Sequence, residues 1–313
     1  MLSKTNSSQS RPRRSWLATA VLWVRRHRLY WILTSLILGA IIAIAAFAVP
    51  AGAVQVRLSP TTLQLGDTLS VVIEQNPSLS SSPTVKVGEK TYPGYITDSG
   101  NFRALIPTTP LDSPGTLRIQ VAAGGEAKNM TVPLRNRSFP TQRIRLSGAA
   151  GAQATQHELD RVAAFKALET PEKYWNGAFL KPNSGRISAE YGIRRYYNGV
   201  FAKDYYHRGV DYAGGAGSPI VAPAAGRVAL VGRLSDGFRV HGNTVGIDHG
   251  QGVTSIMLHM SRIDVKEGDF VQAGQRIGAI GSTGASTGPH LHWGLYVHGL
   301  SVDPVPWRFQ GFQ

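Results

Sequence analysis

The C-terminal third of the chain contains the stretch Gly281-Ser-Thr-Gly-Ala-Ser-Thr-Gly-Pro-His-Leu-His-Trp293. One residue separates its two histidines, and alternate residues of a β-strand face the same side of a sheet. A second pattern, His207-Arg-Gly-Val-Asp211, also has its histidine and its aspartate at an even spacing. Two such strands side by side would bring several imidazoles and one carboxylate to the same surface.

These residue types are the ligands of a catalytic zinc site, where three nitrogen or oxygen donors leave one position for water. The chain has no cysteine, so disulfides, thiolate metal sites and cysteine nucleophiles are excluded. The zinc-binding pattern HExxH is not completed either, because His157-Glu-Leu-Asp-Arg161 lacks the second histidine. A short histidine pattern of this kind is more often formed by structural histidines than by metal ligands. The sequence around the two patterns must therefore decide whether they form a metal site.

Five stretches around these residues resemble the lysostaphin/LytM-type zinc endopeptidases, peptidoglycan hydrolases with a small antiparallel β-fold. They lie between about Gly185 and Pro304. The five stretches are Gly185-Arg-Ile-Ser-Ala-Glu-Tyr-Gly-Ile-Arg194, His207-Arg-Gly-Val-Asp211, Pro219-Ile-Val-Ala-Pro-Ala-Ala-Gly226, Gly242-Asn-Thr-Val-Gly-Ile-Asp-His-Gly250 and the stretch from Gly281 to Trp293.

The resemblance implies one Zn²⁺ per chain, held by His207, Asp211 and His292. It also implies two catalytic histidines beside the metal, His259 and His290, without saying which plays which part. The expected reaction is attack of zinc-activated water on a peptide bond, with both histidines assisting. One departure is Met257-Leu-His-Met260, where the family commonly has Tyr-x-His-Leu, and this puts the shape of the groove in question. Of the remaining histidines, we expect His249 to be structural and both His157 and His241 to lie at the surface.

The charge is distributed unevenly along the chain. Half of the net charge of +14 lies in the first 28 residues, which contain no acidic residue, and residues 29–49 carry no charge. At about 1.5 Å per residue, a helix of that length can cross a bilayer. The positive-inside rule then predicts a cytoplasmic segment at 1–28, a signal anchor at 29–49 and export of all that follows into the periplasm or wall space.

The same N-terminal sequence also fits two kinds of cleaved leader. A signal peptide could be cut at Ala46-Phe-Ala48 or at Ala51-Gly-Ala53, and Arg13-Arg14 fits a twin-arginine signal. We favour the anchor, because the basic region is long and the apolar run exceeds a usual signal core. The expected location is the inner (cytoplasmic) membrane, with release from it if the segment is cleaved.

The rest of the chain is predicted to be mainly β, since charged residues make up only 17% and there are 35 glycines and 18 prolines. Residues 54–137 alternate apolar and polar side chains in short runs, which predicts an immunoglobulin-like β-sandwich serving as spacer or recognition module. Residues 138–180 are predicted to form a linker with a helix at about 156–169, begun by the capping box Thr155-Gln-His-Glu158. Residues 181–313 form the predicted zinc endopeptidase domain, an antiparallel β-fold.

The leading function is an envelope-exposed zinc metalloendopeptidase that cuts cross-links or stems of peptidoglycan. Nucleic acid is not an expected partner, because topology explains half of the basic charge and no basic-aromatic stripe follows. One alternative is an inactive relative that binds the wall and activates another hydrolase, although all five site residues are retained. Another is a periplasmic adaptor, since Val265–Gly281 looks like a biotinyl/lipoyl hairpin, but the modifiable lysine and long heptad arms are missing.

Overall fold

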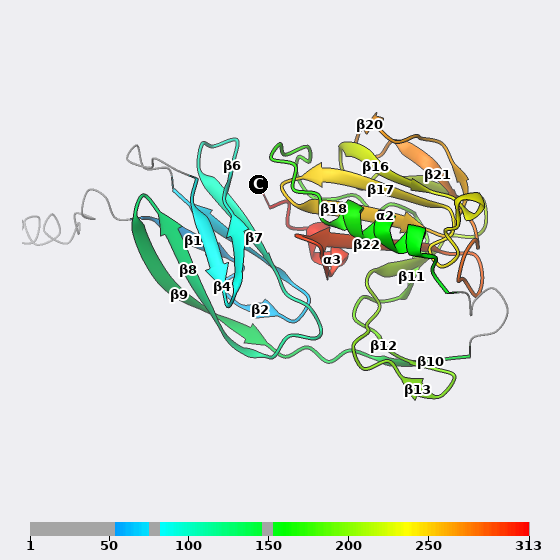
Figure 1. Cartoon of the computed structure of the whole chain (residues 1–313), viewed down its shortest axis with the longest axis horizontal. Coiled ribbons are helices and arrows are strands. Elements are labelled where there is room, and N and C mark those ends of the chain that lie inside the picture. The colour runs from blue at the N-terminus through cyan, green and yellow to red at the C-terminus, as the bar shows by residue number, and fades with distance from the viewer. Residues whose placement is uncertain (1–53, 75–81, 146–152, 313) are drawn as a thin grey trace, which may run out of the picture. The chain divides into compact units, whose positions relative to one another are not determined.

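The computed structural model describes residues 54–74, 82–145 and 153–312, within a compact unit, Val54–Gln313, that is distinct from Met1–Ala53. The basic segment at 1–28 and the membrane helix at 29–49 lie outside the described residues and stay predictions. No helix in the described ranges is long and apolar enough to cross a bilayer. The described chain consists mainly of strands, which confirms the predicted fold class at that level (Figure 1).

Two β-sheets around one core form the first part of the described chain. One sheet has the strand order β1–β3–β7–β6 and the other β2–β9–β8–β4–β5. Along β8, Ile119 and Val121 are buried whereas Arg118 and Gln120 are exposed, as the alternating pattern predicts. The immunoglobulin-like label for this sandwich stays a prediction. Its strands are β1 (Val56–Ser59), β2 (Leu63–Gln64), β3 (Thr68–Ile73), β4 (Thr84–Val87), β5 (Lys90–Pro93), β6 (Tyr95–Ile96), β7 (Phe102–Pro107), β8 (Gly115–Ala123) and β9 (Glu126–Arg135).

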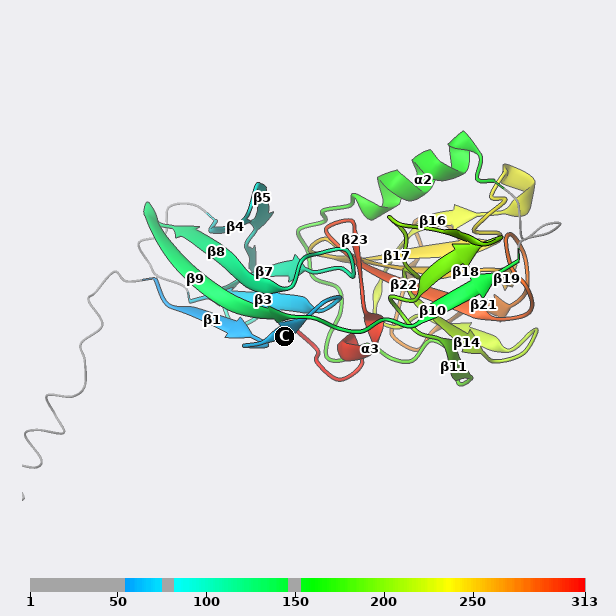
Figure 2. The ribbon, with the colours of Figure 1, turned by 90° about the horizontal axis from the view of Figure 1, so that it is seen from below.

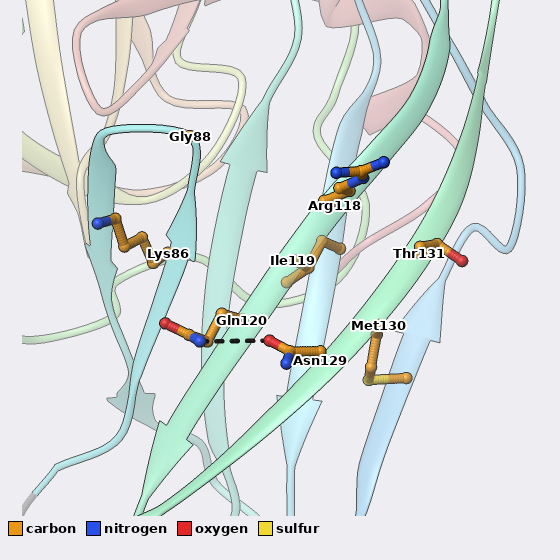
Figure 3. Close-up of a pocket in the computed structure, with 8 residues that line it drawn as sticks. All are labelled: Lys86, Gly88, Arg118, Ile119, Gln120, Asn129, Met130 and Thr131. Carbon is orange, nitrogen blue, oxygen red and sulfur yellow. Dashed lines mark hydrogen bonds between the residues drawn. The ribbon is translucent and has the colours of Figure 1, made fainter.

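A hollow of about 540 Å³ lies on the outer face of the five-stranded sheet (Figure 3). Lys86 and Arg118 line it together with the amides of Gln120 and Asn129, which are 3.3 Å apart and hydrogen-bonded. None of its lining residues is a histidine or a carboxylate. This hollow therefore offers no metal ligand and no general acid or base.

An eight-stranded antiparallel sheet dominates the second part. Its order is β11–β14–β22–β18–β17–β16–β20, with β23 paired to β22. The central strands β17, β18 and β22 are buried along their whole length, and they bury polar side chains with the apolar ones, among them Asp248 and His249 on β17 and Thr254 and Ser255 on β18. The strands are β11 (Arg186–Ala189), β14 (Val210–Ala213), β16 (Gly226–Gly232), β17 (Thr244–Gly250), β18 (Val253–Leu258), β20 (Phe270–Val271), β22 (Leu291–Val297) and β23 (Leu300–Val302).

Two smaller sheets complete the strands of this part. The first has the order β15–β21–β19, formed by β15 (Pro219–Val221), β21 (Arg276–Ile280) and β19 (Met260–Ile263). The second has the order β10–β12–β13 and includes a strand from the predicted linker, because β10 (Thr141–Ile144) pairs in parallel with β12 (Arg194–Tyr197). The strand β13 (Val200–Phe201) pairs with β12 on the other side.

The linker helix α2 (Gln156–Lys166) ends three residues earlier than the sequence indicates. The hydroxyl of Thr155 caps it by accepting from the backbone N–H of Glu158 at 3.1 Å. Val162 and Phe165 are buried, but Leu159 is 49% exposed and does not belong to the packed face of α2. The remaining short helices are η2 (Leu234–Asp236) and α3 (Pro304–Trp307).

Candidate metal centre

Three buried side chains each place one potential ligand atom at a common point. His207 Nε2 is 3.1 Å from Asp211 Oδ1 and 3.0 Å from His292 Nδ1. The third side of the triangle, from His292 Nδ1 to Asp211 Oδ1, measures 2.9 Å. Tetrahedral ligands at zinc–nitrogen distances of about 2.0–2.1 Å lie about 3.3 Å apart. The triangle is therefore close in size to one face of a zinc coordination tetrahedron.

Strand pairing brings two of these residues together. Strands β14 and β22 are antiparallel neighbours, and Asp211 lies directly opposite His292. This is the side-by-side arrangement that the even spacings predict. His207 precedes β14, where its backbone N–H donates to the Ile193 carbonyl at 2.9 Å and its carbonyl accepts from Gly192 N–H at 2.9 Å.

A glycine allows the chain to pass close to the centre between His207 and Asp211. A Cβ atom at Gly209 would lie 2.3 Å from the Trp293 carbonyl oxygen and 2.8 Å from His292 Nε2. Both distances are too short for a real side chain. The glycine of the His-Arg-Gly-Val-Asp pattern is therefore required by the approach of this segment to β22.

Hydrogen bonding determines which nitrogen of His207 faces the centre. Its Nδ1 lies 2.7 Å from the Glu190 carbonyl oxygen, which can only accept, so Nδ1 carries the proton. Nε2 of the neutral ring then has a lone pair directed at a carboxylate oxygen of Asp211. Two acceptors facing each other need a cation between them, and a set of two imidazoles and one carboxylate suits zinc. The residues present thus fit the metal that the resemblance implies.

The electrostatics of the centre favour the forms that bind a metal. Burial lowers the pKa of His292 to about 4, despite the opposing effect of the Asp211 carboxylate. Burial raises the pKa of Asp211, but hydrogen bonds and charge from His207 and His292 outweigh it and hold that pKa well below its usual range. A neutral imidazole and an ionised carboxylate are the states in which these groups bind metal ions.

His259 and His290 lie beside this triangle. Their ring centroids are 4.8 Å apart, and His290 Nε2 is 3.9 Å from Asp211 Oδ1. In both rings Nδ1 donates to a backbone carbonyl at 2.8 Å, that of Thr283 for His259 and that of Gly288 for His290. Nε2 is therefore the acceptor nitrogen of each neutral ring. Burial, together with the neighbouring histidines, lowers the pKa of His259 to about 3.

His259 occupies a break in the strands. It lies between β18 and β19, where the chain leaves the eight-stranded sheet and enters a three-stranded one. Its φ of 62° is in the left-handed region, which is uncommon for residues other than glycine. Its backbone N–H donates to the His241 carbonyl at 3.1 Å. The loop that contains His241 therefore helps to hold His259 in this conformation.

The buried carboxylate of Glu158 on α2 anchors that loop. This residue is not part of the site predicted from the sequence. Glu158 is fully buried and accepts from the backbone N–H groups of Arg239 at 3.0 Å, Val240 at 3.1 Å and His241 at 2.7 Å, and from His241 Nδ1 at 2.6 Å. Burial raises its pKa, but the hydrogen bonds to His241 and Val240 outweigh this and lower it below the ordinary value. The predicted capping box is thus only half right, since the Glu158 carboxylate binds the loop. The prediction that His241 lies at the surface is wrong, because its side chain is only 20% exposed.

The other histidines of the described ranges do not join the centre. His249 is fully buried, with Nδ1 2.8 Å from the Ala225 carbonyl and Nε2 2.9 Å from Ser255 Oγ, which is the expected structural role. Burial lowers its pKa to about 4. His157 is exposed on α2, and His298 pairs with Glu169 at 2.7 Å.

A hollow of about 420 Å³ opens over the centre. The three candidate ligands, His259, His290 and His241 all line it. Met257, which replaces the family's common tyrosine, does not line the hollow and is fully buried in the core opposite Trp293. The replacement of the family's common tyrosine by Met257 therefore affects the packing of the core beneath the centre and not the lining of the hollow.

Comparisons with known proteins point to one family. Residues 205–304 match the family model described as Peptidase family M23. Over 120 residues the chain is 39% identical to the DD-carboxypeptidase/endopeptidase Mpg of Neisseria meningitidis serogroup B, covering 38% of this chain and 26% of that protein. It is 26% identical over 247 residues to the murein hydrolase activator NlpD of Salmonella typhimurium, covering 79% of this chain and 59% of that protein.

Among solved structures, a Pseudomonas aeruginosa protein described as a peptidase M23 aligns with a TM-score of 0.60 and 25% identity. The alignment covers 81% of this chain and 96% of that one. The comparisons confirm the family resemblance that the sequence indicates. The chain spans only about a quarter of the length of the Neisseria relative.

Proposed function

We propose that this chain, which belongs to peptidase family M23 through its C-terminal domain, is a zinc metalloendopeptidase that hydrolyses peptide bonds in peptidoglycan. The triangle of His207, Asp211 and His292, with two further histidines beside it, is the observation that carries the proposal. The name of the Neisseria relative, a DD-carboxypeptidase/endopeptidase, supports the reaction class.

The hydrogen bonds of these residues support the following roles. His207 through Nε2, Asp211 through Oδ1 and His292 through Nδ1 would hold the zinc ion. When bound, zinc supplies a Lewis acid that activates water near neutral pH and polarises a carbonyl group. Nε2 of His259 or of His290 accepts the proton of the attacking water and, once protonated, donates it to the leaving amine. The other histidine, when protonated, donates to the oxygen that gains negative charge.

The test uses purified peptidoglycan sacculi. The zinc-loaded protein and its His292→Ala variant are incubated with sacculi, with and without a chelator, and released fragments are identified by mass spectrometry. We expect new amino termini that require both zinc and His292. Failure of a folded, zinc-loaded protein to release any fragment would contradict the proposal.

The proposed location is the cell envelope. Residues 29–49 would anchor the protein in the inner membrane, and the domains after them would face the periplasm or wall space, with the sandwich as spacer or recognition module. The lack of charge in that segment and the basic residues before it support this topology. A reporter enzyme that is active only outside the cytoplasm, fused after Gln313, should be active. An inactive but intact fusion would refute the topology.

A second candidate function is activation of another wall hydrolase. The likeness to the murein hydrolase activator NlpD, which extends over 79% of this chain, favours it. The complete set of two histidines and one aspartate favours the enzyme. Cellular function that survives His292→Ala would support the activator, whereas its loss together with sacculus cleavage would support the enzyme.

A further inference from the structure

His241 brings a further imidazole to the hollow over the metal centre. Besides His259 and His290, it is a histidine that lines the hollow without being a candidate ligand. Its side chain is 20% exposed, and its backbone carbonyl accepts from the backbone N–H of His259 at 3.1 Å. The proposed reaction uses only His259 and His290. His241 is therefore an accessible imidazole next to the reacting groups to which that reaction gives no part.

The buried carboxylate of Glu158 holds the ring of His241 in place. Helix α2, which carries Glu158, lies next to β16, and the loop with His241 follows β16 (Figure 2). Glu158 Oε1 is 2.6 Å from His241 Nδ1 and 2.7 Å from the His241 backbone nitrogen. The ring also meets the buried Phe238 edge-on, with centroids 6.5 Å apart. A side chain restrained in this way loses little conformational entropy when it binds a ligand.

The same hydrogen bond decides which nitrogen of His241 is available. Four N–H groups point at the Glu158 carboxylate, which accepts them all, so His241 Nδ1 carries a proton. Nε2 has no hydrogen-bond partner among the residues that the structure describes. His259 and His290 follow the same pattern, except that a backbone carbonyl takes the place of the carboxylate. His241 thus presents Nε2 as its unused polar atom at the hollow.

We infer that His241, positioned by Glu158, binds the substrate, and that its Nε2 forms a hydrogen bond with a main-chain amide of the peptide strand that is cut. Nε2 accepts in the neutral ring and donates in the charged ring, and a peptide strand offers both N–H and C=O groups. A strand that lies beside His259 also lies beside His241, because the two backbones are hydrogen-bonded to each other. The inference rests on the proposed function and adds a binding residue to that site.

Two substitutions separate binding through Nε2 from support of the loop. His241→Asn keeps an N–H donor near the place of Nδ1, within reach of Glu158, but has no group at the place of Nε2. His241→Gln does the reverse. Cross-linked muropeptide dimers, released from sacculi by a muramidase, serve as substrate for measuring kcat and KM of the zinc-loaded proteins. We expect His241→Asn to raise KM roughly three- to tenfold, as the loss of one hydrogen bond does, with kcat and zinc content nearly unchanged. His241→Gln should bring KM back toward the wild-type value.

The control variant is His157→Asn. His157 is exposed and contacts the same Phe238 ring, with centroids 6.1 Å apart, but does not line the hollow, so KM should not change. Thermal unfolding checks that each variant is folded. An unchanged KM in His241→Asn, or a fall in kcat alone, would overturn the inference, because His241 would then act only through the loop. Cleavage of the dimers would still uphold the proposed function.

Two binding measurements do not depend on cleavage. Fluorescence anisotropy with labelled dimers should show weaker binding by His241→Asn than by the wild type; this result without cleavage by either protein would uphold the contact and count against the peptidase. In wild-type protein labelled with ¹⁵N-histidine, the Nε2 resonance of His241 should move when the dimers are added in excess, and that of His157 should not. A His241 resonance that stays in place would refute the contact without the use of any variant.

Discussion

Replacing Glu158 with glutamine should destabilise the protein strongly, although the change is small in volume. The buried carboxylate accepts three backbone N–H groups and one imidazole N–H from the loop at 239–241. Glutamine offers one acceptor oxygen and an NH₂ group, so the N–H of Arg239 would lose its acceptor and face another donor. A hydrogen bond to a charged group contributes about 1.5–3 kcal/mol, and disrupting a buried charged network costs about 3–5 kcal/mol. We expect Glu158→Gln to lower the free energy of unfolding by about 3 kcal/mol.

The same change should slow catalysis without removing the metal. The loop supports His259, because His259 N–H donates to the His241 carbonyl at 3.1 Å and Met260 N–H to the Asn243 carbonyl at 3.0 Å. The ligands Asp211 and His292 lie on the paired strands β14 and β22. Zinc content should therefore stay near one ion per chain while kcat falls.

Urea unfolding, zinc analysis and peptide cleavage measure these three effects. Asp160→Asn is the matched control, because Asp160 is an exposed residue of the same helix that accepts from Gln156 Nε2 at 2.7 Å. It should change the free energy of unfolding by less than about 0.5 kcal/mol. If Glu158→Gln unfolds at the same urea concentration as Asp160→Asn, the argument for an anchored loop is refuted.

Three further predictions concern the centre and its support. Asp211→Asn removes the anionic ligand and should weaken zinc binding at least tenfold, which dialysis followed by metal analysis checks; an unchanged zinc content would contradict the ligand assignment. Gly209→Ala should weaken zinc binding and lower the free energy of unfolding by about 1–3 kcal/mol in a melting experiment, because its Cβ would lie 2.8 Å from His292 Nε2. The control Gly288→Ala should be tolerated, because no atom lies within 4 Å of the added Cβ. The pKa of Glu158 is lower in the folded protein, so its stabilising effect is complete above its unfolded pKa of about 4.3 and is lost as the pH falls through the folded pKa. The gap in urea midpoint between wild type and Glu158→Gln should accordingly narrow below about pH 4.5, and a constant gap would count against this account.

Local sequence allows only part of the candidate site to be anticipated. Asp211 and His292 do lie on neighbouring strands, because β14 pairs with β22. His207 precedes β14 and His290 precedes β22, so the spacing rule for strands does not place them, and the set of three candidate ligands follows from the family resemblance. The antiparallel fold of this domain is expected from the family resemblance. The role of Glu158 could not be predicted locally, since a glutamate three residues after Thr155 is also the signature of a capping box.

Long-range pairing, by contrast, leaves no local signal. Glu158 and His241 are 83 positions apart, and no sequence spacing connects them. Lys166 and Arg208 likewise line the same hollow only because α2 packs through Val162 and Phe165. Local patterns and the family resemblance therefore point to the residues that meet at this centre, and they miss the residues that support them.

These contacts bear on where the structural unit that forms the candidate centre begins. The family match starts at residue 205 and the predicted peptidase domain at residue 181, yet Glu158 anchors the loop beside His259 and Lys166 lines the hollow. Further upstream, β10 pairs with β12 and supplies Gln142 to Arg195. A segment that begins at residue 181 would keep all five predicted site residues and lose these three supports. The physical unit of the candidate centre therefore extends to β10, and both β10 and α2 belong to it as much as the strands that carry the candidate ligands do.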